Sequence, residues 1–346
     1  MCNIAGYVGE KRAAPILIEM MKKQEGFAGG YYTGIATIHE GKIYHAKLVG
    51  DTDMLETLTE AAKLPGNVGI LHSRSKSGGG IEWAHPFVDV KNEEPRIAYV
   101  ANGASGFFTE RKASYAPFIV EELISKGYKM SSQVVMEDSI YNKLPDGTTV
   151  HMSDVMCQII LKNIEDGMNV VDAMENGFCT FPSEIVGLML ALDTPDCINY
   201  SRINMPMYVG RADHGTYMAS TPIAFPEDAR EHQLLPPCSS GCVYENGVFS
   251  KAYKECPATV APITARVRHD AYDKILEVLE NKEASLKDLC NATQECFDPA
   301  DIRPRAAVVY DILKSLLAEG KIKCEDVRVD GVYDDITAPQ TRISLK

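Results

Sequence analysis

Residues 2–9 read Cys-Asn-Ile-Ala-Gly-Tyr-Val-Gly, and this stretch decides how the chain is interpreted. Its apolar and aromatic residues predict a first β-strand with Cys2 at its start. If Met1 is removed, Cys2 carries both a thiol and a free α-amino group, so a nucleophile and its general base share one Cα. On the condition that Met1 is removed, we expect Cys2 to act as a catalytic nucleophile. The alternative is a cysteine that only packs in the strand.

The composition of the chain is that of an ordinary globular protein. It has 346 residues, of which 45% are hydrophobic and 24% charged, enough for a sizeable core and two domains. The formal net charge of -13 argues against nucleic acid or an anionic membrane surface as the main partner. No apolar run is long enough to span a membrane, and residues 10–12 are charged where a secretory signal would continue. We expect a cytoplasmic protein.

The ten cysteines are scattered, which favours core positions over a disulfide framework. Cys238 and Cys242 form the closest pair, with His232 as the one nearby candidate for a further metal ligand. This spacing matches known zinc sites poorly. The sequence therefore predicts no metal site.

Short β-rich segments separated by turn formers are predicted at 4–8, 34–38, 42–48, 68–72, 96–101, 184–192, 207–210, 216–219 and 241–244. Helices are expected at 14–24, at 115–126, from Ser153 or Asp154 to just before Gly167, and at 170–174, with an irregular stretch at 131–149. Strands, helices and then strands again indicate an α+β fold built as a layered sandwich.

The sequence changes character near residue 257. Residues 257–268 predict an extended linker between a domain at 2–256 and a second domain at 269–346. In the second domain, helices at 270–279, 285–293 and 306–317 precede strands at 321–327 and 331–333, the element order of a winged helix. Residues 263–346 hold 13 Lys and Arg against 16 Asp and Glu, which favours protein contact or a homodimer over DNA binding.

Asn102-Gly103 follows the strand predicted at 96–101. A thiol that cleaves an amide needs N–H donors aimed at the developing oxyanion, and a side-chain amide beside a glycine N–H supplies two. The alternative is a simple tight turn, because Asn-Gly is the favoured turn dipeptide and recurs here at Asn176 and Asn246.

Arg74 lies two residues after the strand predicted at 68–72 and precedes a polar, glycine-rich stretch. An arginine in this place can hold a substrate carboxylate through two parallel hydrogen bonds. An ordinary surface arginine is the alternative. Asp154, at the start of a predicted helix, fits either an N-cap or a partner for a substrate ammonium group.

Taken in order, Cys2, Arg74, Asn102-Gly103 and Asp154 resemble the glutaminase domain of the class II glutamine amidotransferases, a family of N-terminal nucleophile hydrolases. The resemblance is strongest to the glutaminase half of the glucosamine-6-phosphate synthases and spans roughly residues 2–250. The segments that carry it are Cys2-Asn3-Ile4-Ala5-Gly6-Tyr7, His72-Ser73-Arg74 with Ser77, Ala84-His85-Pro86, Val100-Ala101-Asn102-Gly103 and Ser153-Asp154.

The resemblance implies a four-layer αββα sandwich and a set of catalytic roles. The Cys2 thiolate attacks the side-chain amide of glutamine, and the Cys2 amine carries the proton. Asn102 and Gly103 stabilise the oxyanion. A thioester forms, ammonia leaves, and water releases glutamate, with no cofactor.

The same resemblance implies the substrate-binding residues. Arg74 holds the α-carboxylate of glutamine and Asp154 its α-ammonium group, and Ser77 and His85 belong to the same site. The remaining chain is too short for a sugar-phosphate isomerase half, so the ammonia acceptor is expected on a partner synthase.

Three positions depart from the family pattern. Gly29 stands where the family has an arginine, Ser75 replaces a bulky aromatic residue, and Gly78 replaces a histidine. These changes leave two alternatives open beside a glutamine-hydrolysing amidotransferase subunit. One is an amidohydrolase for another linear amide, and the other is a protein that senses glutamine without turnover.

Overall fold

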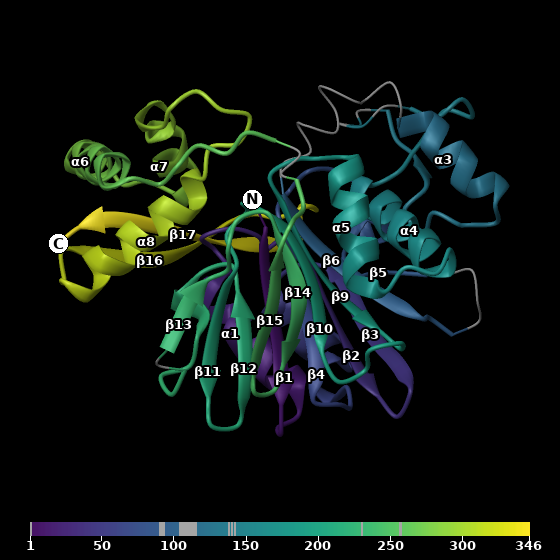
Figure 1. The fold of residues 1–346 in the computed structure, drawn as a ribbon. Helices are drawn as coiled ribbons and strands as arrows, with labels where there is room; N and C mark the ends of the chain where they lie inside the picture. Colours follow the sequence, from purple (N-terminus) through teal and green to yellow (C-terminus); the bar gives the residue numbers. More distant parts are fainter. Residues whose placement is uncertain are drawn as a thin grey trace.

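Two antiparallel β-sheets face each other in the N-terminal part of the chain (Figure 1). The computed structural model describes residues 2–89, 94–103, 116–137, 139, 141, 143–229, 231–255 and 258–346. Met1, whose removal the expected role of Cys2 requires, lies outside these residues.

The first sheet has seven strands in the order β13-β11-β12-β1-β4-β2-β3. Its strands are β1 (Asn3–Gly9), β2 (Tyr32–His39), β3 (Lys42–Val49), β4 (Val68–Arg74), β11 (Tyr208–Ala212), β12 (Gly215–Ala219) and β13 (Glu231–Leu234). β1 lies between β12 and β4 and is buried along its whole length. The apolar run that follows Cys2 is therefore a central strand.

The second sheet has six strands in the order β15-β14-β10-β9-β6-β5. They are β5 (Phe87–Val88), β6 (Ile97–Gly103), β9 (Ile185–Ala191), β10 (Ile198–Ile203), β14 (Ser239–Tyr244) and β15 (Gly247–Ala252). Between the sheets, Ile4 and Ile70 of the first pack in one core with Val100, Leu188 and Ile198 of the second. Because side chains alternate along a strand, the opposite faces of both sheets are free to take helices.

Helices cover both outer faces. On the first sheet, α1 (Ala13–Gln24) packs against β1 and β4, and α2 (Thr52–Leu58) packs beside it. On the second sheet, α4 (Met152–Glu165) covers β5 and β6 and α5 (Val170–Thr180) covers β10 and β14, with α3 (Ala116–Ser125) outside α4. The layers are thus helix, sheet, sheet and helix, as the resemblance implied. Two two-residue strands, β7 (Val134–Val135) and β8 (Thr148–Thr149), pair within the stretch predicted to be irregular.

The C-terminal segment has a hydrophobic core of its own. Its elements are α6 (Ala265–Asn281), α7 (Leu286–Ala292), α8 (Arg305–Ala318), β16 (Ile322–Asp330) and β17 (Thr337–Leu345). Three helices and a hairpin follow in the predicted order, while the assignment as a winged helix stays a prediction.

Two boundaries in this segment differ from the sequence analysis. α6 begins at Ala265, inside the predicted linker, because the Thr264 hydroxyl accepts a hydrogen bond from the Val267 N–H and caps the helix. The second strand of the hairpin lies at 337–345 rather than 331–333. Residues 331–336 form the turn instead, which the Gly331 N–H closes on the Ile336 carbonyl at 3.0 Å.

The hairpin lies against the sandwich of the two sheets, beside the start of β1 (Figure 1). The Thr341 N–H donates to the Gly26 carbonyl at 2.9 Å. The Pro339 ring packs so closely on Gly30 that a Cβ added at Gly30 would lie 2.7 Å from Pro339 Cδ. The Tyr310 hydroxyl of α8 donates to Asn3 Oδ1 at 3.3 Å. The C-terminal segment thus contacts the end of the sandwich where Cys2 lies.

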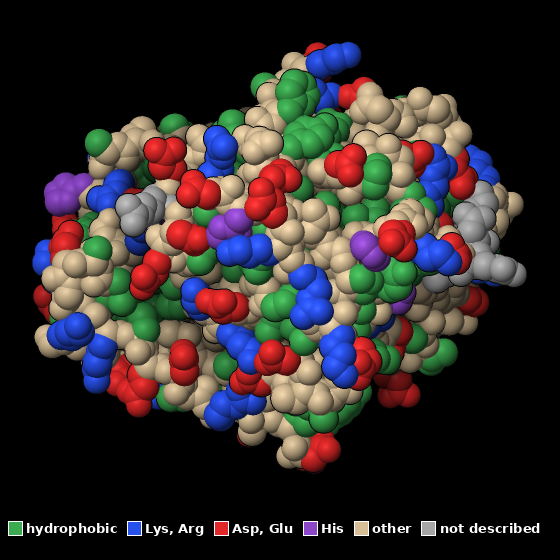
Figure 2. All heavy atoms as spheres, turned by 90° about the horizontal axis from the view of Figure 1, so that it is seen from below, with side chains coloured by type: hydrophobic (Ala, Val, Ile, Leu, Met, Phe, Trp, Pro, Cys, Tyr) green, Lys and Arg blue, Asp and Glu red, His purple; other side chains and the backbone are tan. Residues whose placement is uncertain are grey.

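No helix in the described part of the chain has both the length and the apolar character needed to cross a bilayer. On the face shown in Figure 2, acidic and basic side chains are interspersed, without a broad patch of either sign.

Candidate active site

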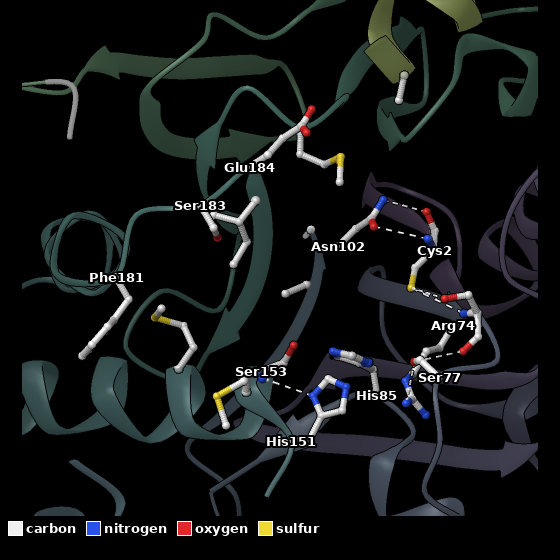
Figure 3. Close-up of a pocket in the computed structure, with 18 of the residues that line it drawn as sticks. Cys2, Arg74, Ser77, His85, Asn102, His151, Ser153, Phe181, Ser183 and Glu184 are labelled. Carbon is white, nitrogen blue, oxygen red and sulfur yellow. Dashed lines mark hydrogen bonds between the residues drawn. The ribbon is translucent and has the colours of Figure 1, made fainter. Parts of the chain in front are cut away.

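A cavity of about 390 Å³ opens where β1 begins and β4 and β6 end. Six of the seven site residues predicted from the sequence line it, and the seventh, Asp154, does not. The six are Cys2, Arg74, Ser77, His85, Asn102 and Gly103. Figure 3 shows most of them converging from different elements on one space.

Cys2 places its thiol on the wall of this cavity. The Ser75 N–H donates to Cys2 Sγ at 3.5 Å, and the Ser75 hydroxyl lies 3.7 Å from the same sulfur. Burial raises the pKa of the Cys2 thiol, but the neighbouring His72 and the Ser75 N–H, together with the other nearby charges, outweigh burial and bring that pKa from 9.0 down to about 6. A thiolate is therefore the favoured form at neutral pH.

His72 is a site residue to which the sequence analysis gave no role. It pairs with Ile4 across β1 and β4, and its Nε2 lies 2.9 Å from the Ala101 carbonyl oxygen. Because residues two apart on a strand share a face, His72 lies on the same face of the sheet as Arg74. That alternation was visible in the sequence and could have indicated His72.

The side-chain amide of Asn102 forms hydrogen bonds to the backbone of Cys2 through both its oxygen and its nitrogen. The Cys2 N–H donates to Asn102 Oδ1 at 3.3 Å, and Asn102 Nδ2 donates to the Cys2 carbonyl at 2.6 Å (Figure 3). Gly103 pairs with Ile185, and a Cβ at Gly103 would lie only 2.5 Å from the Glu184 carbonyl oxygen. Close approach of the neighbouring strand thus requires glycine here.

Arg74 is buried beneath the cavity rather than exposed on the surface. Its guanidinium stacks 4.4 Å above the Tyr32 ring, and its Nη2 donates to the Ser77 hydroxyl and the Gly78 carbonyl at 2.7 and 2.8 Å. Its Nη1 is buried and has no hydrogen-bond partner among the residues that the structure describes. A buried guanidinium with a free donor is suited to an anionic ligand.

Residues 75–80 form the loop that contacts Arg74. Gly78 and Gly79 have φ of +87° and +75°, a region that favours glycine, and a Cβ on Gly79 would lie 2.3 Å from the Trp83 ring. Lys76 Nζ donates to the Gly331 carbonyl of the C-terminal hairpin at 2.6 Å. The hairpin therefore contacts the loop directly.

Asp154 does not reach the cavity. Its carboxylate is fully buried and accepts hydrogen bonds from Ser131, from the backbone and hydroxyl of Ser132, and from Gln158, at 2.8 to 3.2 Å. The residue that caps α4 is His151, whose Nδ1 accepts from the Ser153 N–H at 3.1 Å. The geometry thus gives Asp154 a structural position and does not carry its expected contact with the ammonium group of glutamine.

His85 lies between His72 and His151, at ring-centroid distances of 3.9 and 5.3 Å. Neither of its ring nitrogens has a hydrogen-bond partner in the described part of the chain. Burial and then the neighbouring charges of His72, His151 and Arg74 hold the pKa of His85 well below its usual 6.5, so the ring is neutral. Within the described residues, no three His, Cys, Asp or Glu side chains are arranged to hold a metal ion.

The departure at Gly29 has a steric cause. Gly29 has φ of +83°, and a Cβ there would lie 2.6 Å from Ser73 Oγ and 2.7 Å from the Ser73 carbonyl oxygen. Ser73 in turn donates to the buried carboxylate of Glu25 at 2.5 Å. An arginine at Gly29 would therefore displace the end of β4 beside Arg74.

In sequence and in fold, the chain is similar to the glutaminase domain of the class II glutamine amidotransferases. It is similar to the N-terminal region of glutamine–fructose-6-phosphate aminotransferases. The enzyme of Pyrococcus horikoshii is 29% identical over 227 residues, 65% of this chain and 33% of the relative. That of Clostridium tetani is 28% identical over 336 residues, 96% of this chain and 46% of the relative. No protein-family model matches the chain.

The chain spans less than half the length of these curated relatives. Among solved structures, the glutamine phosphoribosylpyrophosphate amidotransferase of B. subtilis superposes with a TM-score of 0.59 at 14% identity, over 85% of this chain and 64% of that one. The allosteric regulatory enzyme of purine biosynthesis gives 0.57, also at 14% identity, over 89% and 63%. At this identity the superpositions establish the shared fold alone.

Proposed function

We propose that this protein hydrolyses the side-chain amide of glutamine through a thioester on Cys2. The observation that carries the proposal is the junction of β1, β4 and β6 in one cavity. It brings a low-pKa thiol, a buried arginine with a free donor and the Asn102-Gly103 dipeptide to a single space.

The chemistry starts at Cys2. Its thiolate attacks the amide carbon, and the negative charge that develops on oxygen is stabilised by Asn102 Nδ2, which has a second N–H beside the one given to Cys2, and by the Gly103 N–H. After loss of Met1, the Cys2 amine transfers the proton to the leaving ammonia. Water then cleaves the thioester and releases glutamate.

Arg74 orients the substrate. Its free Nη1 binds the α-carboxylate of glutamine, while its Nη2 stays fixed by Ser77 and Gly78. His85 lines the same part of the cavity and, as a neutral ring with two free nitrogens, offers one donor and one acceptor. In this scheme Asp154 holds residues 131–132 in place.

The experiment that tests the proposal is an intact-mass measurement after incubation with a glutamine-like diazoketone. One alkyl group on a chain that lacks Met1, located at Cys2 by peptide mapping, supports the proposal. A chain that keeps Met1 and is not alkylated at Cys2 contradicts it. The Cys197→Ala variant is the matched control, because Cys197 is buried away from the cavity.

The released ammonia passes to a synthase partner in this proposal. The support is the similarity to relatives that are named as aminotransferases. Co-purification from the native host tests this step. Vigorous free glutaminase activity with no co-purifying partner would contradict it.

A second candidate substrate is a linear amide without an α-amino group. The observation that favours it is the orientation of Asp154, which leaves Glu184 as the sole acidic side chain among the described residues that line the cavity. Figure 3 shows Glu184 far from Arg74 and Ser77. Comparing ammonia release from glutamine and from its analogue without the amino group decides between the two. A preference for glutamine of tenfold or more in kcat/KM excludes the second candidate.

A further inference from the structure

The cavity continues past Cys2, away from the arginine that binds the substrate. The wall on that side is formed by Glu184, Met205, Cys290, Arg305 and Ala306. The last three belong to α7 and α8, so the C-terminal segment closes this part of the cavity. A single glutamine is smaller than the ligands that cavities of about 390 Å³ commonly enclose, and this leaves room for a second small molecule.

Glu184 is held beside the oxyanion-stabilising dipeptide. It immediately precedes β9, whose first residue Ile185 pairs with Gly103, and the Glu184 carbonyl closely approaches Gly103. Figure 3 shows its carboxylate beyond Asn102, on the opposite side from Arg74. A glutamine whose carboxylate is held by Arg74 and whose amide is at Cys2 therefore cannot place its own ammonium group at Glu184.

The carboxylate of Glu184 has no hydrogen bond or ion pair with any described residue. Burial raises its pKa to about 7, although the charges of Arg305 and Arg202 oppose that rise. Arg305 uses Nη1 to donate to Gln294 Oε1 at 2.9 Å, and the other nitrogens of its guanidinium have no described partner. The compartment thus offers one free carboxylate and one cation between the apolar side chains of Met205, Cys290 and Ala306.

We propose that this compartment binds a small amino acid as a second substrate, with its amino group at Glu184 and its carboxylate at Arg305, and that the γ-glutamyl group passes from Cys2 to this amine in competition with water. The proposal rests on the proposed function, because it needs the Cys2 thioester. A nucleophile must enter on the side where ammonia leaves, and the carboxylate of Glu184 lies on the side away from Arg74.

The step is balanced as follows. The amine lone pair attacks the thioester carbonyl, a C–N bond forms, and the C–S bond breaks. Glu184 accepts the proton that the amine loses, and that proton returns to the Cys2 sulfur. The products are a γ-glutamyl amino acid and the free thiol, and no oxidant or reductant is needed.

The test measures γ-glutamyl products and glutamate by mass spectrometry with glutamine and increasing glycine, and in parallel with ethylamine, which lacks a carboxylate. We expect γ-glutamylglycine to form with saturation kinetics. Glu184→Gln should lower the ratio of γ-glutamylglycine to glutamate at least tenfold. Arg305→Met should raise the half-saturating glycine concentration at least tenfold without a comparable change for ethylamine, and Arg303→Met, a neighbour that does not line the cavity, is the control.

Glutamate as the sole product while glutaminase activity is intact would overturn this inference and leave the proposed function standing. The same product ratio in Glu184→Gln and wild type would also overturn it. Absence of both products with every acceptor would instead overturn the proposed function, and this inference with it. Thermal unfolding of each variant verifies that it is folded.

Discussion

Asn102 and Cys2 hold each other through two hydrogen bonds, one to the Asn102 oxygen at 3.3 Å and one from its nitrogen at 2.6 Å. The same asparagine therefore positions the nucleophile and offers a second N–H to the oxyanion. This double contact also means that the start of β1 is tied to the end of β6 across the two sheets.

Asn102→Ala should lower kcat for glutamine hydrolysis about 10²- to 10³-fold, because removing one oxyanion donor costs about 3–4 kcal/mol in the transition state. The measurement is steady-state ammonia release. Asn246→Ala is the matched control. Asn246 also precedes a glycine, but it lies exposed in the turn between β14 and β15. Equal losses in both variants would contradict the role of Asn102.

The Cys2 thiol should react with iodoacetamide at a rate that is half-maximal near pH 6. Its pKa is lowered from 9.0 to about 6, so the thiolate predominates at pH 7 and is lost as the pH falls through 6. Cys324 is an exposed residue, but partial burial of its thiol raises the thiol pKa above 9.0, so it should react only under alkaline conditions. Peptide mapping after pulse labelling follows both sites, and a common pH profile for the two would refute the prediction.

Arg74→Lys should raise KM for glutamine about 10- to 100-fold. The planar guanidinium of Arg74 contacts Ser77 and Gly78 with Nη2 and leaves Nη1 for the substrate, an arrangement that lysine cannot reproduce. A hydrogen bond to a charged group contributes about 1.5–3 kcal/mol, which sets the expected size of the change in KM. Arg211→Lys, on an exposed position of β11, should leave KM as it is. An unchanged KM in Arg74→Lys would show that the carboxylate is bound elsewhere.

The hairpin of β16 and β17 should contribute to the stability of the N-terminal domain. Arg328 Nη2 lies 2.6 Å from the buried carboxylate of Asp51, which also caps α2. Arg328→Ala leaves that carboxylate without its cation and should lower the free energy of unfolding in urea by about 1–3 kcal/mol. Arg342→Ala, which removes a half-exposed pair with Glu283 at 3.7 Å, should cost less than about 1 kcal/mol. Equal effects would contradict a specific role for the Arg328 contact.

Much of the site was predictable because its residues lie at the ends of strands with clear patterns. Cys2, Arg74 and Asn102 each adjoin an apolar run, and three strand ends in one layered sandwich meet at one edge. Asp154 shows the limit of this reasoning. The carboxylate of an acidic residue at a helix start can face the cavity or the protein interior. Here it faces Ser131 and Ser132, and these lie in a stretch whose sequence has no helical or strand periodicity.

The far wall of the cavity could not be predicted from the sequence. Arg305 and Cys290 come from a separate core and reach the site only through the packing of the C-terminal segment. Elements without a strong local signal were also missed, namely α2, β5, β7, β8, β10, β13 and β15. β15 is largely exposed, so it lacks the apolar run that marks a buried strand.

The most direct test of the account is the mass of the protein trapped during turnover. Acid quenching of the enzyme with saturating glutamine should give a chain without Met1 that is heavier by one γ-glutamyl group, attached at Cys2 and removable by neutral hydroxylamine. Cys2→Ala should show no such adduct and no ammonia release. If Met1 is retained, or if Cys2→Ala releases ammonia as fast as the wild type, the central claim is wrong.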